Sequence, residues 1–450
     1  MRITLPDTPA FAAVRHGVAT LEKSGFPTRL VGGSVRDLLL GKTPSDLDLV
    51  TTATPEKVLE LFPGSTLVGA SFGVALLKID GFSFECASAR KERVYMDGRH
   101  PEKVSYTTDL AVDSERRDFT INAMMCDPDS GEVFDWHNGV EDLKTGIVRT
   151  VGDPDRRFSE DYLRMLRAVR FAAKYGFEIE TETAAAIRRH APKAANISVE
   201  RINDEVSTIL TNPHPERGLE LLETLGLLQY ILPEVAALRG VTQPVEFHPE
   251  GDVFDHTKLM LAHIMPGDKL LAWSVLLHDI GKPLTRSVDP DGRIRFFNHE
   301  AVGEKIAGKI LTELRFSNDE IASITHAIAN HMRFAFVPQM RKAKVLRLLA
   351  EKDFPLEAEL NRIDCLCSNG CMGSFITLLD KLGEMPTTKL PEAFVSGDDL
   401  IALGATPGPL FKNLLESVFD AQLAGEAANR SEALTLAAKL LAEAQKSLSE

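Results

Sequence analysis

The sequence lacks any segment that would cross a membrane, and it has few cysteines. Residues 1–10 show no cationic start followed by an apolar run, and the longest apolar stretches, such as residues 270–277, fall far short of the ~20 residues of a membrane span. The five cysteines are odd in number, and Cys365, Cys367 and Cys371 do not have the paired C-x-x-C spacing of a zinc knuckle. We therefore expect a cytoplasmic protein with reduced thiols and no membrane partner.

An excess of positive charge is also absent. The formal net charge of -14 argues against a chain that binds nucleic acid through its overall field. Local basic surfaces remain, and they lie in two runs: Arg156, Arg157, Arg164, Arg167, Arg170 and Lys174, and Arg341, Lys342, Lys344 and Arg347. With 44% hydrophobic and 26% charged residues the composition is that of a globular protein. The length of 450 residues predicts about three domains.

The pattern of the chain changes near residue 152. Residues 8–24 have the apolar spacing of a helix that ends at Gly25. The runs that follow are short, β-branched or alternating, and are cut by Gly, Pro and Asp, which predicts a mixed sheet with helices on it. Beyond Asp153 the spacing is almost entirely helical, without internal repeats or a long low-complexity linker. We expect an α+β head followed by all-α regions.

Two aspartates in "SDLDLV" predict a metal site. Asp46 and Asp48 alternate with Leu47 and Leu49, so on a strand both carboxylates would point to the same face. Two converging oxygen ligands suit Mg²⁺, which keeps several waters and binds substrate phosphates, with room for a second ion. A D-x-D alone is more often a solvated edge strand, so the neighbouring sequence must decide.

The segment before these aspartates predicts an anion site. Gly32 and Gly33 follow the strand-like "TRLV", and with Ser34 they open the helical "SVRDLLLG", so amide N–H groups and Arg36 would face an anion. A cation between the carboxylates would convert repulsion of a triphosphate into binding. The "GKT" at residues 41–43 is not a P-loop, because Arg36 stands where that pattern needs glycine, and no G-x-G-x-x-G can be formed.

The segment "GGSVRDLLLGKTPSDLDL" resembles the signature of the class II tRNA nucleotidyltransferases and bacterial poly(A) polymerases, of the polymerase β-like superfamily. Three further motifs match in order: "ERRDFTINAM" at 115–124, "EDYLRMLRAVRFAAKYGF" at 160–177 and "SVERINDE" at 198–205. The resemblance implies a polymerase β-like head in which Asp46 and Asp48 bind Mg²⁺ and activate an RNA 3′-hydroxyl, which displaces pyrophosphate. Glu85, in "FSFEC", is the expected third carboxylate.

The resemblance also implies how the nucleotide is chosen. We expect "SEDYLRMLRAVRF" to form a helix capped by Ser159, with a polar stripe at every third residue: Asp161, Arg164, Arg167 and Arg170. In the family, the positions of Asp161 and Arg164 hydrogen-bond the Watson–Crick edge of CTP or ATP, so protein replaces a template. Arg117, Arg167 and Arg170 match further nucleotide-binding positions. Asp118 and Asn122 either brace the head or are ordinary buried polar residues.

A charged segment bears on which nucleotides are added. The sequence "ARKERVYMDGRHPE", residues 89–102, predicts a mobile loop between two strands. Family enzymes that add the terminal A keep this loop, so its presence leaves full CCA addition, A addition alone or poly(A) synthesis. The stretch "LVGASFGVALLKI" resembles CCA-adding members and lacks the basic signature of poly(A) polymerases, which favours CCA addition to tRNA from CTP and ATP.

The middle of the chain predicts a second metal site. The segments "FDHTKLML", "LLHDIGKPLT" and "LNRIDCL" resemble the HD phosphohydrolase domain, and some HD domains hold a second metal at the positions of His299 and His331. The expected ligands are His256, His278, Asp279, His299, His331 and Asp364. The resemblance implies a divalent metal such as Ni²⁺, Mn²⁺ or Co²⁺ and hydrolysis of phosphomonoesters or 2′,3′-cyclic phosphates. His263 and His326 are expected to be structural.

These patterns predict four regions: a nucleotidyltransferase head at 1–152, a helical neck and body at 153–250, an inserted all-helical HD domain at 251–372 and a helical tail at 373–450. The tail is expected to contact tRNA through its shape and phosphates. No protein partner is evident. Two other classes stay open, namely an HD phosphohydrolase whose head senses nucleotides, and a non-catalytic RNA-binding module.

Overall fold

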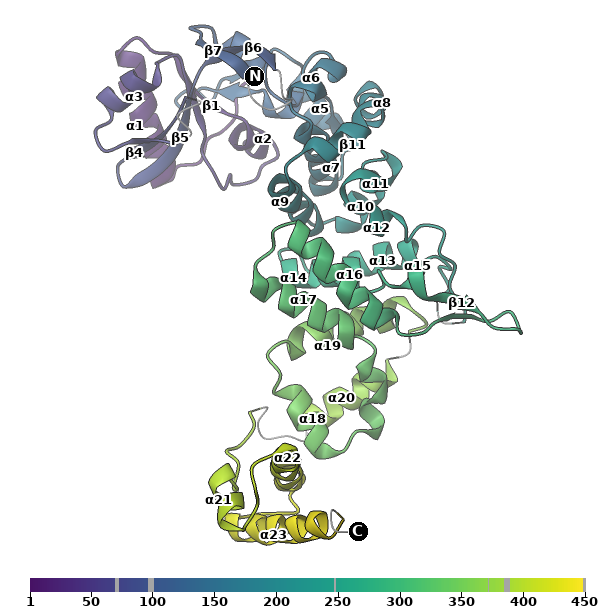
Figure 1. Cartoon of the computed structure of the whole chain (residues 1–450). Helices are drawn as coiled ribbons and strands as arrows, with labels where there is room; N and C mark the ends of the chain where they lie inside the picture. Colours follow the sequence, from purple (N-terminus) through teal and green to yellow (C-terminus); the bar gives the residue numbers. More distant parts are fainter. Residues whose placement is uncertain (69–72, 96–100, 247, 371, 384–388, 448–450) are drawn as a thin grey trace. The chain divides into compact units, whose positions relative to one another are not determined.

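The computed structural model describes residues 1–68, 73–95, 101–246, 248–370, 372–383 and 389–447 (Figure 1). The chain forms two compact units. The first comprises residues 1–237 with 265–269 and 313–315, and the second comprises residues 238–264, 270–312 and 316–450. Among the described residues, no helix combines the length and the apolar character needed to cross a membrane.

The first unit opens with a seven-stranded sheet in the order β3-β4-β5-β2-β1-β8-β9. Its strands are β1 (Thr28–Val31), β2 (Leu49–Thr51), β3 (Thr66–Leu67), β4 (Val74–Ile79), β5 (Phe82–Ser88), β8 (Met125–Cys126) and β9 (Val133–Phe134). β2 and β5 pair in parallel, and the other neighbours pair antiparallel. The predicted mixed sheet is therefore confirmed.

Helices cover this sheet. They are α1 (Pro9–Lys23), α2 (Gly33–Leu39), α3 (Pro55–Leu61), α4 (Leu110–Ser114), the 3₁₀ turn η2 (Thr120–Asn122) and α5 (Gly139–Thr145). α1 confirms the predicted first helix: its cap Thr8 accepts a hydrogen bond from the Phe11 amide at 3.4 Å. Its buried face, which includes Val14, Val18 and Leu21, lies against β4 and β5 (Figure 1).

The segment predicted as a mobile loop at 89–102 is instead largely a β-hairpin. β6 (Arg90–Tyr95) pairs antiparallel with β7 (Pro101–Tyr106), with Arg90 opposite Tyr106 and Lys91 opposite Ser105. Residues 96–100 lie outside the described part of the chain. The charge content misled the prediction, because the strands of a two-stranded ribbon carry polar side chains as readily as a loop does.

The remainder of the first unit is helical. It contains α6 (Pro154–Glu160), α7 (Leu163–Tyr175), α8 (Thr181–His190), η3 (Ala191–Asn196), α9 (Val199–Leu210), α10 (Pro215–Thr224), α11 (Leu228–Ile231) and α12 (Pro233–Ala236). α7 packs on both α9 and α10. A short parallel pair, β10 (Ile147–Val148) and β11 (Glu178–Ile179), stands apart from the main sheet, so the strand expected in "GIVRTVG" does not join it.

The helix predicted to start at Ser159 starts later. Ser159 lies in the last turn of α6, where its hydroxyl donates to the Arg156 carbonyl at 2.8 Å. The chain then extends at Asp161, with φ of -155°, and α7 begins at Leu163. Asp161 Oδ1 accepts the Leu163 amide at 3.1 Å. The prediction was wrong because aspartate, not the preceding serine, supplies the acceptor at this helix start.

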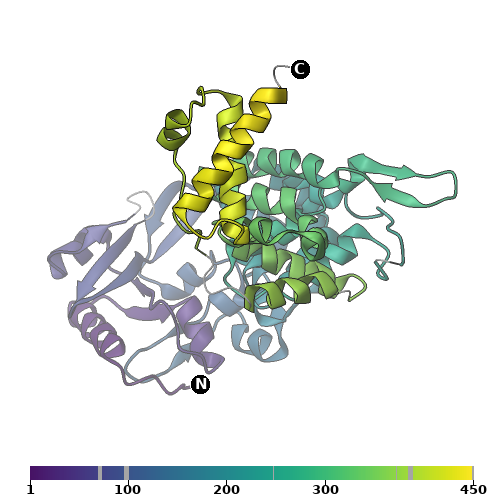
Figure 2. The same cartoon turned by 90° about the horizontal axis from the view of Figure 1, so that it is seen from below.

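The second unit is mainly helical. Its helices are α13 (Val253–Leu261), α14 (Lys269–Leu277), α15 (Lys282–Thr285), α16 (His299–Glu313), α17 (Asn318–Asn330), η4 (Arg333–Gln339), α18 (Lys342–Leu349), α19 (Phe354–Cys367), α20 (Gly373–Gly383), α21 (Gly397–Ala402), α22 (Pro409–Ala424) and α23 (Arg430–Ser447). It is not all-helical as predicted, because β12 (Arg286–Val288) and β13 (Ile294–Phe296) form an antiparallel hairpin. Figure 2 shows this hairpin extending away from the helices around it.

The most apolar run of the sequence forms a buried helix. Residues 271–277 of α14 are all buried, including Trp273, which packs edge-on against Phe316 with ring centroids 5.0 Å apart. A helix that is apolar on every side belongs in a core rather than on a surface. α14 therefore anchors the segment that follows it, which carries His278 and Asp279.

Candidate functional site

The aspartate pair lies beside the central strands of the head. Asp46 and Asp48 were predicted on a strand, but β2 begins only at Leu49, and both residues lie in the extended segment before it. This segment still follows the sheet, because the Asp48 carbonyl accepts the Val31 amide at 3.0 Å. The Ser45 hydroxyl donates to Asp46 Oδ2 at 2.9 Å.

The electrostatics of this pair fit a cation. Burial, followed by repulsion from Glu85 and Asp46, raises the pKa of Asp48 to about 6, although Arg117 opposes the shift. Glu85 lies on β5 and is exposed, and it lines one cavity with Asp46 and Asp48, but the three carboxylates are not among the described groups whose ligand atoms lie within 4.8 Å of one another. Hard oxygen ligands that repel one another are what Mg²⁺ binds. The residues present therefore fit a divalent ion.

The two glycines start a short helix next to these carboxylates. Gly32 has a φ of 71°, a conformation that favours glycine, and it directly precedes α2. A Cβ on Gly33 would lie 3.4 Å from Nη2 of Arg36. Arg36 is itself buried and donates from Nη1 to Oδ1 of Asn122 at 2.6 Å. The turn therefore brings backbone amides and a fixed guanidinium to the same place.

Asp118 and Asn122 brace this arrangement. Asp118 Oδ1 accepts a hydrogen bond from Asn122 Nδ2 at 3.1 Å. Its Oδ2 accepts two bonds from Arg167, from Nε at 2.8 Å and from Nη2 at 2.6 Å. Burial opposes ionisation of Asp118, but the charge and hydrogen bonds of Arg167 outweigh it and hold the pKa below its usual value. A chain of bonds thus connects Arg36 to α7.

A cavity of about 330 Å³ collects most of the predicted head residues. Those that line it are Gly32, Gly33, Ser34, Arg36, Asp46, Asp48, Arg117, Asp118, Asn122, Arg167 and Arg170, together with Lys174. Glu85, Asp161 and Arg164 are not among its lining residues. Carboxylates and guanidinium groups thus line the same cavity, which suits a polyphosphate bound through a metal.

The remaining residues of the predicted stripe are held by partners on neighbouring helices. Asp161 accepts two bonds from Arg201 of α9, at 3.1 and 2.7 Å. Arg164 Nη1 donates to Glu160 Oε2 at 2.8 Å, and Arg170 Nε lies 2.7 Å from Glu205 Oε1. The motif "SVERINDE" was matched without roles for Arg201 and Glu205. Their spacing of four on one helix face was the signal that could have identified them.

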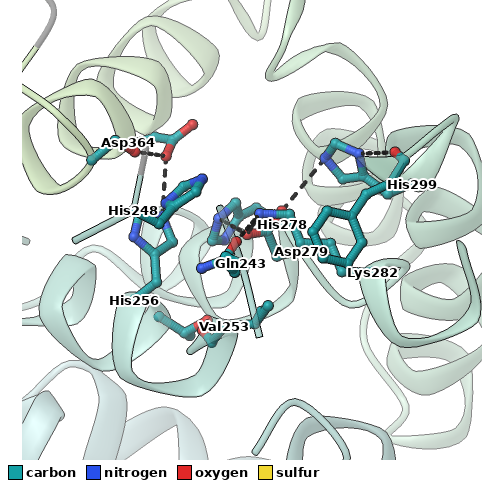
Figure 3. Close-up of polar contacts among 12 residues, drawn as sticks. Gln243, His248, Val253, His256, His278, Asp279, Lys282, His299 and Asp364 are labelled. Atoms are coloured by element: carbon teal, nitrogen blue, oxygen red, sulfur yellow. Dashed lines mark hydrogen bonds and ion pairs between the residues drawn. The ribbon is translucent and has the colours of Figure 1, made fainter. Parts of the chain in front are cut away.

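The six predicted HD residues converge in the second unit, and all of them except His331 are labelled in Figure 3. His256 Nε2 lies 3.1 Å from Asp364 Oδ1, and His278 Nε2 lies 3.1 Å from Asp279 Oδ2. His299 Nε2 lies 3.5 Å from Asp279 Oδ1 and 3.2 Å from His331 Nε2. The six come from α13, α16, α19 and the ends of α14 and α17, and His278 and Asp279 are adjacent in the chain.

The Nδ1 atom orients three of the four imidazoles, those of His278, His299 and His331. Nδ1 of His278 donates to the Val275 carbonyl at 2.8 Å, and His299 and His331 make the same bond to carbonyls three residues earlier, at 2.9 and 2.7 Å. Each Nε2 is therefore left as a free acceptor, which is the state that binds a metal. Burial, followed by repulsion from His278 and His299, lowers the pKa of His331 to about 4, so it is neutral near pH 7.

The ligand atoms form two groups that share Asp279. One contains His256, His278 and Asp279, and the other contains Asp279, His299 and His331. His278 Nε2 is buried, yet it makes no hydrogen bond of acceptable geometry. A buried acceptor that faces a carboxylate without bonding to it is explained by an ion between them. Each group would suit a divalent ion, and Asp279 would be a ligand in both.

The sequence analysis missed polar residues around this cluster. Lys282 Nζ lies 2.6 Å from Asp279 Oδ2 and donates to Gln243 Oε1 at 2.5 Å. His248 and His256 both face Glu250, at 3.2 and 2.7 Å. Lys282 is the last residue of the quoted "HDIGK", and it is buried. Its place three residues after Asp279 was the signal in the sequence that could have identified it. His326 lies 2.9 Å from Glu357, outside this cluster, and His263 is exposed.

Close backbone packing at Gly281 supports the HD cluster. A Cβ there would lie 2.1 Å from the His299 carbonyl oxygen and 2.8 Å from the Gly303 amide nitrogen. We expect Gly281→Ala to force α15 and α16 apart and to lower stability by about 1–3 kcal/mol, measured by urea unfolding. Gly373→Ala is the control, since nothing lies within 4 Å of its added Cβ. Equal stability of the two variants would contradict the close approach.

Three segments of the chain match known protein families. Residues 28–149 match the poly A polymerase head domain, residues 176–238 match the "probable RNA and SrmB- binding site of polymerase A", and residues 253–366 match the HD domain. The chain is 31% identical over 427 residues to a CCA-adding enzyme of Leuconostoc mesenteroides, covering 93% of this chain and 94% of that protein. It is 31% identical over 434 residues to one of Geobacillus stearothermophilus, covering 94% and 95%.

A solved structure extends the agreement to the whole fold. The Bacillus stearothermophilus CCA-adding enzyme in complex with CTP superimposes with a TM-score of 0.73 at 26% identity. The superposition covers 98% of this chain and 99% of that one. The predicted resemblance is confirmed: with its paired carboxylates, its arginine-lined cavity and these full-length relatives, the chain belongs to the CCA-adding enzyme family of nucleotidyltransferases.

Proposed function

We propose that this chain adds the 3′-terminal CCA to tRNA from CTP and ATP, releasing pyrophosphate, without a nucleic-acid template. The observation that carries the proposal is one cavity lined by Asp46 and Asp48 together with Arg36, Arg117, Arg167 and Arg170. The relatives that cover 93% and 94% of this chain are named CCA-adding enzymes, which supports it. We propose the cytoplasm as its location.

In this proposal the chain's own residues position the two reactants. Asp46 and Asp48, with Glu85 nearby, would hold Mg²⁺, which when bound neutralises phosphate charge and polarises the attacking hydroxyl. The amides of Gly33 and Ser34 and the Arg36 guanidinium would bind phosphate oxygens. Asp118 keeps Arg167 oriented through its two bonds. These residues align the α-phosphate with the RNA hydroxyl for in-line displacement.

The hydrogen-bonding capacity of Asp161 supports selection of C and A. An ionised carboxylate offers about four acceptor positions. The two bonds from Arg201 and the bond from the Leu163 amide use three of them. The remaining position would accept one N–H. Cytosine and adenine both carry an exocyclic amine on the Watson–Crick edge, whereas uracil and guanine carry a carbonyl there. We propose that Asp161 reads this amine and that Arg164 donates to the adjacent ring nitrogen.

Labelled nucleotides test the proposal directly. A tRNA lacking its 3′ end is incubated with the protein, Mg²⁺ and radiolabelled CTP alone. We expect two cytidines to be added, and subsequent ATP to add a single adenosine. Absence of label from CTP would refute CCA addition. Addition of one adenosine only to tRNA that already ends in CC would favour an A-adding enzyme, and a long adenosine tract would favour a poly(A) polymerase.

We further propose that the HD cluster is a metal-dependent phosphohydrolase for phosphomonoesters or 2′,3′-cyclic phosphates, groups carried by damaged RNA ends. The two ligand groups that share Asp279 favour it, because paired ions can activate water and stabilise the leaving oxygen. A cavity of about 430 Å³ adjoins them, lined among others by Lys282, Arg293 and Phe296. Protein that leaves a 2′,3′-cyclic nucleotide intact with Mg²⁺, Mn²⁺, Ni²⁺ and Co²⁺ alike would refute this activity.

Each of the four regions of the chain takes a role in the proposal. The head at 1–152 would carry the transfer chemistry, and the neck and body at 153–250 would carry nucleotide selection and part of the tRNA contact. The HD domain at 251–372 would act on its own substrate. The tail at 373–450 has its own core, which includes Leu400, Leu414 and Val418, and would contact tRNA. Salt-dependent binding of tRNA should follow, because such contacts involve phosphates.

A further inference from the structure

A buried glutamine beside the HD cluster has an amide group without a partner. Gln243 is 4% exposed and lines the cavity of about 430 Å³ that adjoins the cluster. In Figure 3 it lies among the labelled HD residues. Its Nε2 atom is buried, and no described residue accepts a hydrogen bond from it. A buried donor without an acceptor costs free energy, so this amide is expected to find its partner in a bound molecule.

The other end of the amide fixes its orientation. Gln243 Oε1 accepts a hydrogen bond from Lys282 Nζ at 2.5 Å, and an ammonium group can only donate. A flip of the amide would place N–H groups against N–H groups. The ammonium group is held in turn by Asp279 Oδ2, which lies 2.6 Å away. Nε2 is therefore a fixed donor in the wall of the cavity.

The backbone that carries Gln243 is fixed as well. Its amide donates to the Gly251 carbonyl at 3.0 Å, and the Val253 amide donates to the Val241 carbonyl at 3.1 Å. These bonds hold the two ends of the segment 241–253 together, next to the start of α13. Gln243 thus belongs to the HD site, although it precedes the segment that matches the HD domain, which begins at residue 253.

The charges that line this cavity favour an anion. Its basic residues are Lys282, Arg293 and Arg295, and its carboxylates are Asp279 and Asp364. Both carboxylates are predicted metal ligands, so bound divalent ions would cancel their charge. The basic residues would then dominate the lining. A fixed amide donor among positive charges suits the oxygen of a phosphate group.

We propose that Gln243 donates through Nε2 to a phosphate oxygen of the substrate of the HD site. The inference rests on the proposed phosphohydrolase, and it identifies a substrate-binding residue outside the HD motifs. Nε2 carries two N–H bonds, so it can hold one phosphate oxygen or two oxygens of the same group. Lys282 keeps the amide in place and does not have to leave Asp279 when the substrate binds.

Equilibrium binding of inorganic phosphate tests the inference without catalysis. The protein is loaded with whichever of Mg²⁺, Mn²⁺, Ni²⁺ and Co²⁺ supports the fastest hydrolysis. By isothermal titration calorimetry, Gln243→Met should weaken phosphate binding about tenfold, because it removes the donor at similar size. Gln243→Glu should weaken it at least as much, because it keeps an acceptor for Lys282 and replaces the donor with a negative charge.

Two further readouts separate this role from a merely structural one. In both variants the KM for a 2′,3′-cyclic nucleotide should rise by a factor larger than the fall in kcat. Metal content per chain, measured by atomic emission, should not fall. Gln339→Met and Gln339→Glu are the matched controls, since Gln339 is exposed and is not among the described residues that line this cavity. Both should bind phosphate as the wild-type protein does.

The other outcomes are distinguishable. Unchanged phosphate binding and KM in both Gln243 variants would overturn the inference and leave the hydrolase standing. A lower kcat with unchanged phosphate binding would also refute it, by assigning the amide to the attacking water. Loss of metal from both variants would refute it by assigning Gln243 to support of the ligands. Wild-type protein that neither binds phosphate nor hydrolyses the cyclic nucleotide with any of the four ions would overturn the proposed hydrolase, and this inference with it.

Discussion

Replacement of both Asp46 and Asp48 by alanine is expected to abolish nucleotide addition and to leave HD hydrolysis unchanged. The two carboxylates are the ligands that would bring the metal to the triphosphate, and loss of its charge stabilisation should cost at least about 1000-fold, or about 4 kcal/mol in the barrier. The measurement is incorporation of labelled CTP into trimmed tRNA, alongside hydrolysis of a 2′,3′-cyclic nucleotide by the same protein.

The fold should survive this double substitution. The folded-state pKa of Asp48, raised to about 6, means that ionisation of this group opposes folding as pH rises from about 4 to 6, and the cost is complete above 6. Removal of the carboxylate should therefore not destabilise metal-free protein at pH 7.5. Asp129→Asn, at an exposed head position, is the control and should keep full activity. Substantial CTP incorporation by the double variant would exclude the proposed catalytic role of the pair.

Replacement of Asp279 by asparagine should have the opposite effect on the two activities. Asp279 belongs to both ligand groups, so this one change should weaken both ions and reduce hydrolysis at least about 1000-fold, while nucleotide addition continues. Metal content per chain, measured by atomic emission, should fall together with the activity. His299→Ala should affect one group only and should lower the bound metal by about half.

His263→Ala provides the matched control for these variants. His263 is exposed and lies just beyond α13, the helix that carries His256, so its loss should change neither metal content nor hydrolysis. An Asp279→Asn protein that retained both ions would disprove the bridging role. If Asp279→Asn instead stopped nucleotide addition as well, the two activities would not be separable, and the hydrolase would have to be reconsidered as part of the transfer reaction.

Local sequence was a good guide where a site depends on a few adjacent residues. The order Gly32, Gly33, Arg36 and then Asp46 and Asp48 predicted a polar cavity at a short helix, and these residues line one cavity. Local sequence was a poor guide to boundaries. Ser159 and Asp161 are both good caps, and only the turn between α6 and α7 selects Asp161. The charged segment at 89–102 was predicted to be a loop, because amino-acid composition does not show which segments pair as strands.

The sequence also did not predict the partners of the charged side chains. Arg167 and Arg170 share one helix face, yet one pairs with Asp118 and the other with Glu205. Lys282, Gln243 and His248 gather around the HD cluster from separated segments. Contacts of this kind span tens of residues, and each depends on how helices pack rather than on the spacing within one helix.

By itself, the sequence determined the family, the mixed sheet of the head and the residue types of both metal sites, because short motifs with fixed spacing encode ligands that lie on one turn or strand. Only the tertiary structure decided that Asp279 is shared by two ligand groups and that Asp46 and Asp48 line two cavities. Those features arise where β5, α1 and residues 43–48 meet, or where several helices converge. The pattern of residues within one segment does not predict which distant segments will pack against it.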